Sequence, residues 1–145
     1  MGRWRCLRAL YRALEPACRK QIHRLAVTTH RCAMLGVGCG TGALTQTVLL
    51  RAAPASVTGV DLSHGFLGYA QDRTNDQPAT FLAGDAQTLS FADGAFEAVV
   101  AGLVLNFVPD PARAVDEMKR VLRPAGTCAA YVWDYAEGMQ LIRHF

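Results

Sequence analysis

The chain has 145 residues, of which 51% are apolar and 19% charged, and its formal net charge is +3. This length suits one domain with one buried core, and this composition is that of a globular protein, not of a disordered one. No apolar stretch reaches the roughly 18 residues that a transmembrane helix needs, and no apolar run follows the first arginines as in a signal peptide. We therefore expect a cytoplasmic protein with no membrane partner.

The charge is distributed unevenly along the chain. Residues 1–32 hold eight Lys or Arg and one acid, a net charge of +7, whereas residues 33–145 have a net charge of −4. A basic segment can bind nucleic acid or an anionic membrane, and an Arg-rich start can be a transit peptide, but this one contains no serine. We interpret residues 1–32 as a solvated, basic helical segment and residues 33–145 as the α/β core of a single domain, with no nucleic-acid partner.

The cysteines predict neither disulfides nor a metal site. Their number is odd, and no two of them form a C-x-x-C pair, so a disulfide framework and a zinc site are both disfavoured. The five residues are Cys6, Cys18, Cys32, Cys39 and Cys128. We expect reduced thiols, as is usual in a cytoplasmic protein.

From residue 32 onward, short apolar runs alternate with helical patterns, whereas residues 1–32 carry apolar residues at helical spacing only. Strands are expected at 32–37, 57–60, 80–83, 96–101 and 127–133, with helices at 41–50, from Ser63 onward and from Pro111 to Leu122. Ser63 and Asp110 are expected N-caps, and Pro111 suits a first helical position. The alternation predicts an α/β fold, a doubly wound and mostly parallel sheet of about five strands with helices on both faces.

Glycines and acids follow the first three expected strands. Gly38-Cys39-Gly40-Thr41-Gly42 comes after the first strand, Asp61 after the second, and Gly84-Asp85-Ala86 after the third. In a doubly wound sheet the ligand binds beyond the carboxyl ends of the strands. Glycines let a ligand approach the backbone, Asp61 can accept from two ribose hydroxyls, and Asp85 can accept from an adenine amino group. Each residue alone could serve only packing or a helix N-terminus, so the combination carries the hypothesis.

A nicotinamide dehydrogenase is a competing interpretation. Gly38-x-Gly40-x-x-Ala43 satisfies the dinucleotide fingerprint, and Asp61 lies at about the expected distance of 20 residues. Two features favour a smaller nucleoside cofactor. The glycine turn is compact, as suits a cofactor without a pyrophosphate, and the acid after the third strand has no counterpart in that fingerprint.

These motifs together resemble the class I S-adenosylmethionine-dependent methyltransferases, especially their small-molecule branch, the methyltransferase type 11 domain. The resemblance runs from about residue 34 to the end. It includes Gly59-Val60-Asp61, the stretch from Phe96 to Asp110, and Arg120-Val121-Leu122-Arg123-Pro124-Ala125-Gly126. It implies S-adenosyl-L-methionine as the cofactor and a small molecule as the methyl acceptor.

The resemblance also implies where the cofactor lies. The methionyl tail would contact Gly38, Cys39 and Gly40, the sulfonium side would face Ala101 and Gly102, and the nucleoside would contact Asp61, Leu62, Asp85 and Ala86. Many enzymes of this family need no general base, so no catalytic residue is assigned. His64, Tyr69 and Tyr135 are interpreted as structural.

Three departures from the family pattern stand out. Gly36 replaces the usual acid two residues before the first motif glycine, Glu97 replaces an Asp, and the sequence stops at Phe145, where the family continues with two more strands. We expect from this a truncated copy of low activity with an open sheet edge, which can pair with a second copy. The runner-up hypothesis is a cofactor-binding module without turnover, and a nicotinamide dehydrogenase is third.

Overall fold

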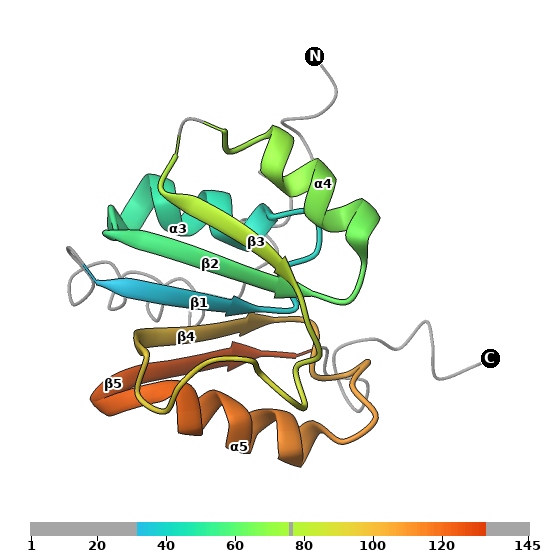
Figure 1. Ribbon diagram of the computed structural model, residues 1–145, viewed down its shortest axis with the longest axis vertical. Helices are drawn as coiled ribbons and strands as arrows, with labels where there is room; N and C mark the ends of the chain where they lie inside the picture. The colour runs from blue at the N-terminus through green and yellow to red at the C-terminus, as the bar shows by residue number, and fades with distance from the viewer. Residues whose placement is uncertain (1–31, 76, 133–145) are drawn as a thin grey trace.

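The computed structural model describes residues 32–75 and 77–132 (Figure 1). Five strands alternate with three helices in the order β1 (Ala33–Val37), α3 (Ala43–Ala52), β2 (Ser56–Asp61), α4 (His64–Asp72), β3 (Ala79–Ala83), β4 (Phe96–Gly102), α5 (Pro111–Val121) and β5 (Leu122–Tyr131). The strands form one sheet in the order β3-β2-β1-β4-β5, and all four strand pairs are parallel. The predicted fold class is confirmed. The helical patterns expected within residues 1–31 lie outside the described residues.

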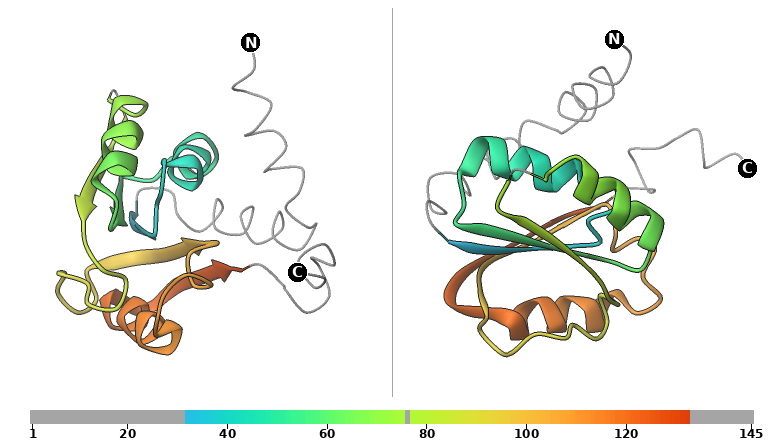
Figure 2. Two further views of the ribbon diagram at one scale, coloured as in Figure 1. Left: turned by 90° about the vertical axis from the view of Figure 1, so that its right-hand side faces the viewer. Right: turned by 45° about the horizontal axis from the view of Figure 1, so that its top comes forward.

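The sheet separates two apolar cores because its central strand is buried on both faces. In β1, Met34 packs with Val48 of α3, whereas Leu35 and Val37 pack with Met118 of α5. Alternate residues of a strand point to opposite faces, so a continuous apolar run is needed where helices cover both sides. Figure 2 shows α3 and α4 on one side of the sheet and α5 on the other.

The expected helix caps are present. The Ser63 side chain accepts a hydrogen bond from the Phe66 backbone N–H at the start of α4. Asp110 does the same for the Arg113 N–H at the start of α5, whose first residue is Pro111. Both side chains satisfy backbone donors that have no partner within the helix. None of the helices within the described ranges is long and apolar enough to cross a membrane.

Two boundaries differ from the sequence expectation. Helix α3 begins at Ala43 and not at Thr41, because Gly42 adopts a left-handed conformation with φ +79° and so stands outside the helix. Strand β5 begins at Leu122, whereas the sequence pattern predicts a strand from residue 127. Its pairing with β4 shifts register between Phe96 and Ala98, and Ala125 has φ +63°. Residues 124–126 therefore form an irregularity within the strand, as a bulge does, and not a turn that precedes it.

The parallel arrangement brings all the strand ends that carry motif residues to one edge of the sheet. Val37 at the end of β1 is aligned with Val60 of β2 and with Ala101 of β4. Strand β1 is followed along the chain by β2 on one side, and β4 lies on its other side. The carboxyl end of β1 is thus the point where the strand order reverses, at which doubly wound sheets bind their ligands.

Candidate cofactor site

The glycine turn after β1 is held against β2. The Cys39 N–H donates to the Val60 carbonyl at 3.0 Å, and the Gly42 N–H donates to the Cys39 carbonyl at 2.9 Å. Gly38 and Gly40 have φ of +63° and +52°, in the left-handed region that side chains disfavour. A Cβ at Gly40 would meet nothing within 4 Å, so open space lies there for a ligand. A Cβ at Gly38 would lie 2.2 Å from the Val104 side chain, so this position requires glycine for packing as well.

Cys39 lies with its side chain inside the protein. The residue is buried, and a Cβ built on Gly59 of β2 would lie 3.0 Å from the Cys39 Sγ. Burial, together with the negative charge of Asp61, raises the pKa of the thiol to about 12. The thiol therefore stays protonated and unreactive at neutral pH. Any contact of Cys39 with a cofactor would come from its backbone.

Asp61 connects the glycine turn to α4. Its Oδ2 accepts a hydrogen bond from the Gly40 N–H at 2.8 Å, and its Oδ1 accepts one from the Ser63 N–H at 2.9 Å. A carboxylate has about four acceptor positions, two on each oxygen. Each oxygen of Asp61 therefore keeps capacity for one further donor, which suits two neighbouring hydroxyl groups.

Asp85 lies on the turn after β3 and is bonded to Gln87. The Gln87 backbone N–H donates to Asp85 Oδ1 at 2.8 Å, and the Gln87 side-chain amide lies 3.1 Å from both carboxylate oxygens. The backbone N–H first, and then the side-chain amide, lower the pKa of Asp85, so the group is ionised at neutral pH. Ala86 is buried in the core on the α5 side, so only its backbone can meet a ligand.

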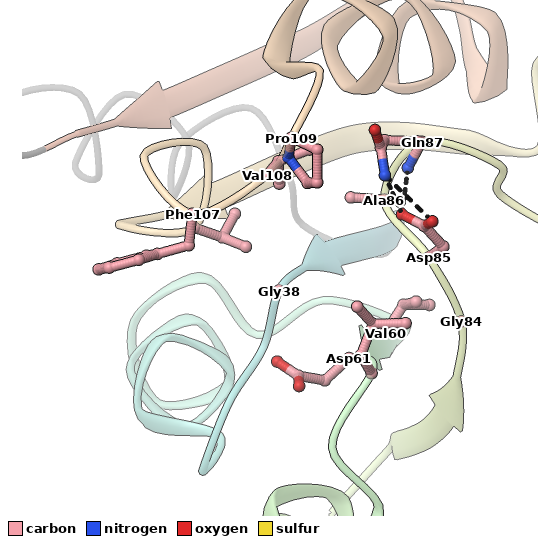
Figure 3. Close-up of a pocket in the computed structure, with 12 residues that line it drawn as sticks. Gly38, Val60, Asp61, Gly84, Asp85, Ala86, Gln87, Phe107, Val108 and Pro109 are labelled. Atoms are coloured by element: carbon pink, nitrogen blue, oxygen red, sulfur yellow. Dashed lines mark hydrogen bonds between the residues drawn. The ribbon is translucent and has the colours of Figure 1, made fainter.

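A cavity of about 140 Å³ joins these strand ends (Figure 3). It is lined by Gly38, Val60, Asp61, Leu62, Gly84, Asp85, Ala86, Gln87, Val104, Phe107, Val108 and Pro109. Pockets that enclose a whole drug-sized ligand are typically about 300–1,000 Å³. This cavity can therefore enclose one part of a nucleoside, such as the base, while the remainder lies along the open glycine turn. Leu62 and Phe107 are each 71% exposed and offer apolar surface at its margin.

Ala101 and Gly102 are not among the residues that line this cavity. The Ala101 side chain is buried in the core on the α5 side. A Cβ on Gly102 would lie 2.6 Å from the Tyr131 hydroxyl, so β5 closes over this glycine. The loop that follows β4 lines the cavity instead, through Val104 and Phe107, and the expected cofactor contacts of Ala101 and Gly102 stay a prediction.

His64 and Tyr69, two of the residues that the sequence analysis set aside as structural, are also outside the cavity lining. The Tyr69 hydroxyl accepts a hydrogen bond from Arg73 on the exposed side of α4. His64 is the exposed first residue of the same helix. Tyr135 lies outside the described residues. Glu97 does not line the cavity. Its carboxylate accepts a hydrogen bond from the Ala33 N–H at 2.6 Å and pairs with Arg123.

Gln87 and the loop after β4 are the residues that sequence reasoning missed. Gln87 follows Asp85 by two positions, the spacing at which a short acid accepts from the backbone in a turn, and this spacing could have indicated the contact.

Gly36, where the family has an acid, is buried in β1. A Cβ there would have ordinary contacts of 3.8 Å to Thr45 Oγ1 and 3.9 Å to the Thr58 carbonyl. A side chain is thus not excluded from this position by packing.

Comparison with known proteins relates this chain to methyltransferases. A family model described as a methyltransferase domain matches residues 35–130. The phosphatidylethanolamine N-methyltransferase of Cereibacter sphaeroides is 38% identical over 97 residues, which are 64% of this chain and 46% of that protein. The demethylmenaquinone methyltransferase of Staphylococcus aureus is 39% identical over 94 residues, which are 63% of this chain and 39% of that protein. The chain thus spans less than half the length of these two relatives.

A solved structure shows the same fold. The crystal structure of a SAM-dependent methyltransferase from Aquifex aeolicus superposes with a TM-score of 0.71, over 81% of this chain and 65% of that one, at 17% identity. This likeness shows the fold. The family match agrees with the interpretation based on the glycine turn and the two acids, and it favours that interpretation over a nicotinamide dehydrogenase. The chain belongs to the methyltransferase-domain family, whose cofactor is S-adenosyl-L-methionine.

Proposed function

We propose that this domain binds S-adenosyl-L-methionine at the carboxyl edge of the sheet and transfers its methyl group to a small-molecule acceptor. The observation that carries the proposal is the Asp61 carboxylate. It lines the cavity, and each of its oxygens accepts one backbone N–H and keeps capacity for one hydroxyl. This is the acceptor pair that the two hydroxyls of a ribose need.

The other site residues fit the remaining parts of the same molecule. The open space at Gly40 has room for the methionyl tail. The cavity beside Asp85 and the Ala86 backbone has the size of one part of a nucleoside, and Asp85 is an acceptor for an amino group. Leu62 and Phe107 supply apolar surface on which a flat base can pack.

The described residues would contribute to methyl transfer by positioning the cofactor. When bound, the cofactor supplies an electrophilic methyl group on a positively charged sulfur. The described residues bind and orient it, and holding two reactants in line can lower a barrier by several kcal/mol. No described residue is assigned as a general base, because a neutral nucleophile with a basic lone pair can accept the methyl group first and release its proton to water afterwards.

The acceptor is proposed only as a class. Two relatives are named for phosphatidylethanolamine and for demethylmenaquinone, and here an exposed aromatic side chain, Phe107, lies at the margin of the cavity. We propose an acceptor that carries apolar groups and packs against this margin. The second candidate is a cofactor-binding module without turnover, which is favoured by Gly36 at the position where the family has an acid.

Thermal unfolding with added ligands tests the cofactor assignment. S-adenosylhomocysteine at about 100 times its Kd should stabilise the fold by about 2.7 kcal/mol, and NAD at the same concentration should leave the melting temperature unchanged. A shift with NAD and none with S-adenosylhomocysteine would overturn the proposal. Binding of the cofactor together with no methylation of any apolar amine, phenol or carbon acceptor would support the module without turnover.

A further inference from the structure

Gln87 joins two walls of the cavity through one side chain. Its amide N–H group lies 3.1 Å from both oxygens of Asp85, and its Oε1 accepts from the Asp110 N–H at 3.1 Å. The first contact is to the turn after β3, and the second is to the start of α5. These contacts also assign the amide orientation, since the opposite one would place an oxygen against the carboxylate.

The backbone of Gln87 strengthens the same connection. Its carbonyl accepts from the Arg113 Nε at 3.0 Å, so α5 is bonded to this residue at two points. Loop residues Phe107, Val108 and Pro109 lead directly into α5 and also line the cavity. In Figure 3 the Gln87 side chain points at Asp85 and lies between the two walls. Gln87 thus fixes the separation of the two surfaces between which a base would lie.

The contacts also distinguish the two oxygens of Asp85. Oδ1 accepts from the Gln87 backbone N–H and from its side-chain amide, whereas Oδ2 accepts from the side-chain amide alone. With two acceptor positions on each oxygen, Oδ1 is satisfied and Oδ2 keeps one position for a ligand donor. The orientation of that position depends on the Gln87 amide.

We propose that Gln87 is a positioning residue that sets the specificity of the site for a 6-aminopurine over a 6-oxopurine. It directs Asp85 Oδ2 at the exocyclic amino group and holds the wall from 107 to 109 at the matching distance. A 6-oxopurine presents an acceptor at the same place, so the charged Asp85 would face it without a shared proton. This inference rests on the proposed function, because the purine is that of the cofactor.

The experiment compares S-adenosylhomocysteine with its deaminated analogue S-inosylhomocysteine, in which an oxo group replaces the 6-amino group and N1 carries a proton, by calorimetric titration of the full chain. The wild-type protein should prefer the adenosine compound by about tenfold or more, the scale of a hydrogen bond to a charged group. Gln87→Glu keeps the acceptor for the Asp110 N–H but replaces the donor to Asp85 with a like charge. It should lower the preference to within about threefold.

Two further variants separate positioning from charge and from folding. Gln87→Met removes the side-chain hydrogen bonds to Asp85 and from the Asp110 N–H without adding charge, and it should lower the preference as Gln87→Glu does. Gln71→Glu makes the same change in charge on the exposed surface of α4 and should leave the preference at the wild-type value. In an Asp85→Ala background, Gln87→Met should have no additional effect on the preference, since the two residues act as one unit.

The outcomes are distinguishable. Folded Gln87→Glu and Gln87→Met variants that keep the wild-type preference would overturn the inference, and so would a wild-type protein that binds both compounds equally well. The second result would leave the proposed function intact. A wild-type protein that binds neither compound would overturn the proposed function, and the inference would fall with it.

Discussion

The carboxylate of Asp61 holds two backbone segments together, in addition to its expected contact with a ribose. It accepts the Gly40 N–H on one oxygen and the Ser63 N–H on the other, and so it fixes the glycine turn relative to the start of α4. From the sequence, the two interpretations of Asp61, a ribose acceptor and a charge at a helix N-terminus, were alternatives. In the structure they are compatible, because a carboxylate has enough acceptor positions for both.

Asp61→Ala should therefore weaken ligand binding and also lower stability. We expect each lost charge-assisted hydrogen bond to a ribose hydroxyl to cost roughly 1.5–3 kcal/mol of binding free energy. The free energy of unfolding should fall by about 1–3 kcal/mol, because two backbone N–H groups lose their acceptor. Titration with S-adenosylhomocysteine and urea denaturation measure the two effects. Asp72→Ala, at the exposed end of α4, is the control. Wild-type affinity in a folded Asp61→Ala protein would leave Asp61 a structural role alone.

For single residues, the sequence predicted positions at strand ends better than it predicted side-chain contacts between strands. The glycine turn, Asp61 and Asp85 line or adjoin the cavity as expected, because the ends of parallel strands meet at one edge. The buried orientation of the Cys39 thiol and the closure of Tyr131 over Gly102 depend on neighbouring strands. Such contacts join residues far apart in the chain, and no local pattern encodes them.

At the scale of elements, the segment between β3 and β4 contains no helix and is held by α5. The Arg120 guanidinium donates to the Leu89 and Phe91 carbonyls and pairs with Glu117. The Glu117 carboxylate in turn accepts from the Leu89 N–H at 2.7 Å. This ion pair therefore supports the segment that begins with Asp85, through backbone contacts that replace a regular secondary structure.

The same ion pair should make stability depend on pH. The hydrogen bond from Arg120, followed by that from the Leu89 N–H, lowers the pKa of Glu117 from 4.5 to about 2, against the opposing effect of burial. A depressed pKa in the folded state stabilises the protein above the unfolded pKa, and this stabilisation is lost as the pH falls from about 4.5 toward 2. The deficit in unfolding free energy of Glu117→Gln relative to wild type should therefore be largest at neutral pH and should shrink at about pH 3.

Urea denaturation of both proteins at the two pH values measures this difference. Asp116→Asn changes a neighbouring acid that is 77% exposed and pairs with Lys119 at 3.4 Å. Exposed pairs contribute little, so this control should show almost no pH-dependent difference. A Glu117→Gln deficit that is the same at neutral and acidic pH would contradict this prediction, because the charge of Glu117 would then not carry the stabilisation.

The elements themselves were largely predictable from the sequence, and the differences have local causes. Buried parallel strands give short apolar runs, which is why β1, β2 and β4 appeared within a residue or two of their observed bounds. The start of α3 was missed because the left-handed Gly42 cannot be told from a helical residue by composition. Strand β5 was predicted too late because a Pro-Ala-Gly sequence indicates a turn, whereas here it is accommodated as an irregularity inside the strand.

At the scale of the whole molecule, the two cores consist of side chains packed between strands and helices, whereas the site consists of loops. The cores on the two faces of the sheet are formed mainly by apolar side chains from strands and helices. The site collects loops from four places, the turn after β1 and the segments after β2, β3 and β4, all at the carboxyl edge. Loops carry few buried contacts, so they open locally more easily than the cores do. A ligand that touches all four should join them.

Hydrogen exchange of backbone amides with and without S-adenosylhomocysteine tests this arrangement. Protection should increase at residues 38–42, 61–63, 84–87 and 103–109, because a bound ligand suppresses the local opening of every loop that it contacts. The loops at the opposite edge, 53–55 and 92–95, should exchange at the same rate in both samples, and they serve as an internal control. Saturating NAD should leave all of these segments unchanged. Protection confined to the opposite edge would place the ligand elsewhere, whereas protection at 38–42 and 61–63 without 84–87 would show that the base lies outside the cavity beside Asp85.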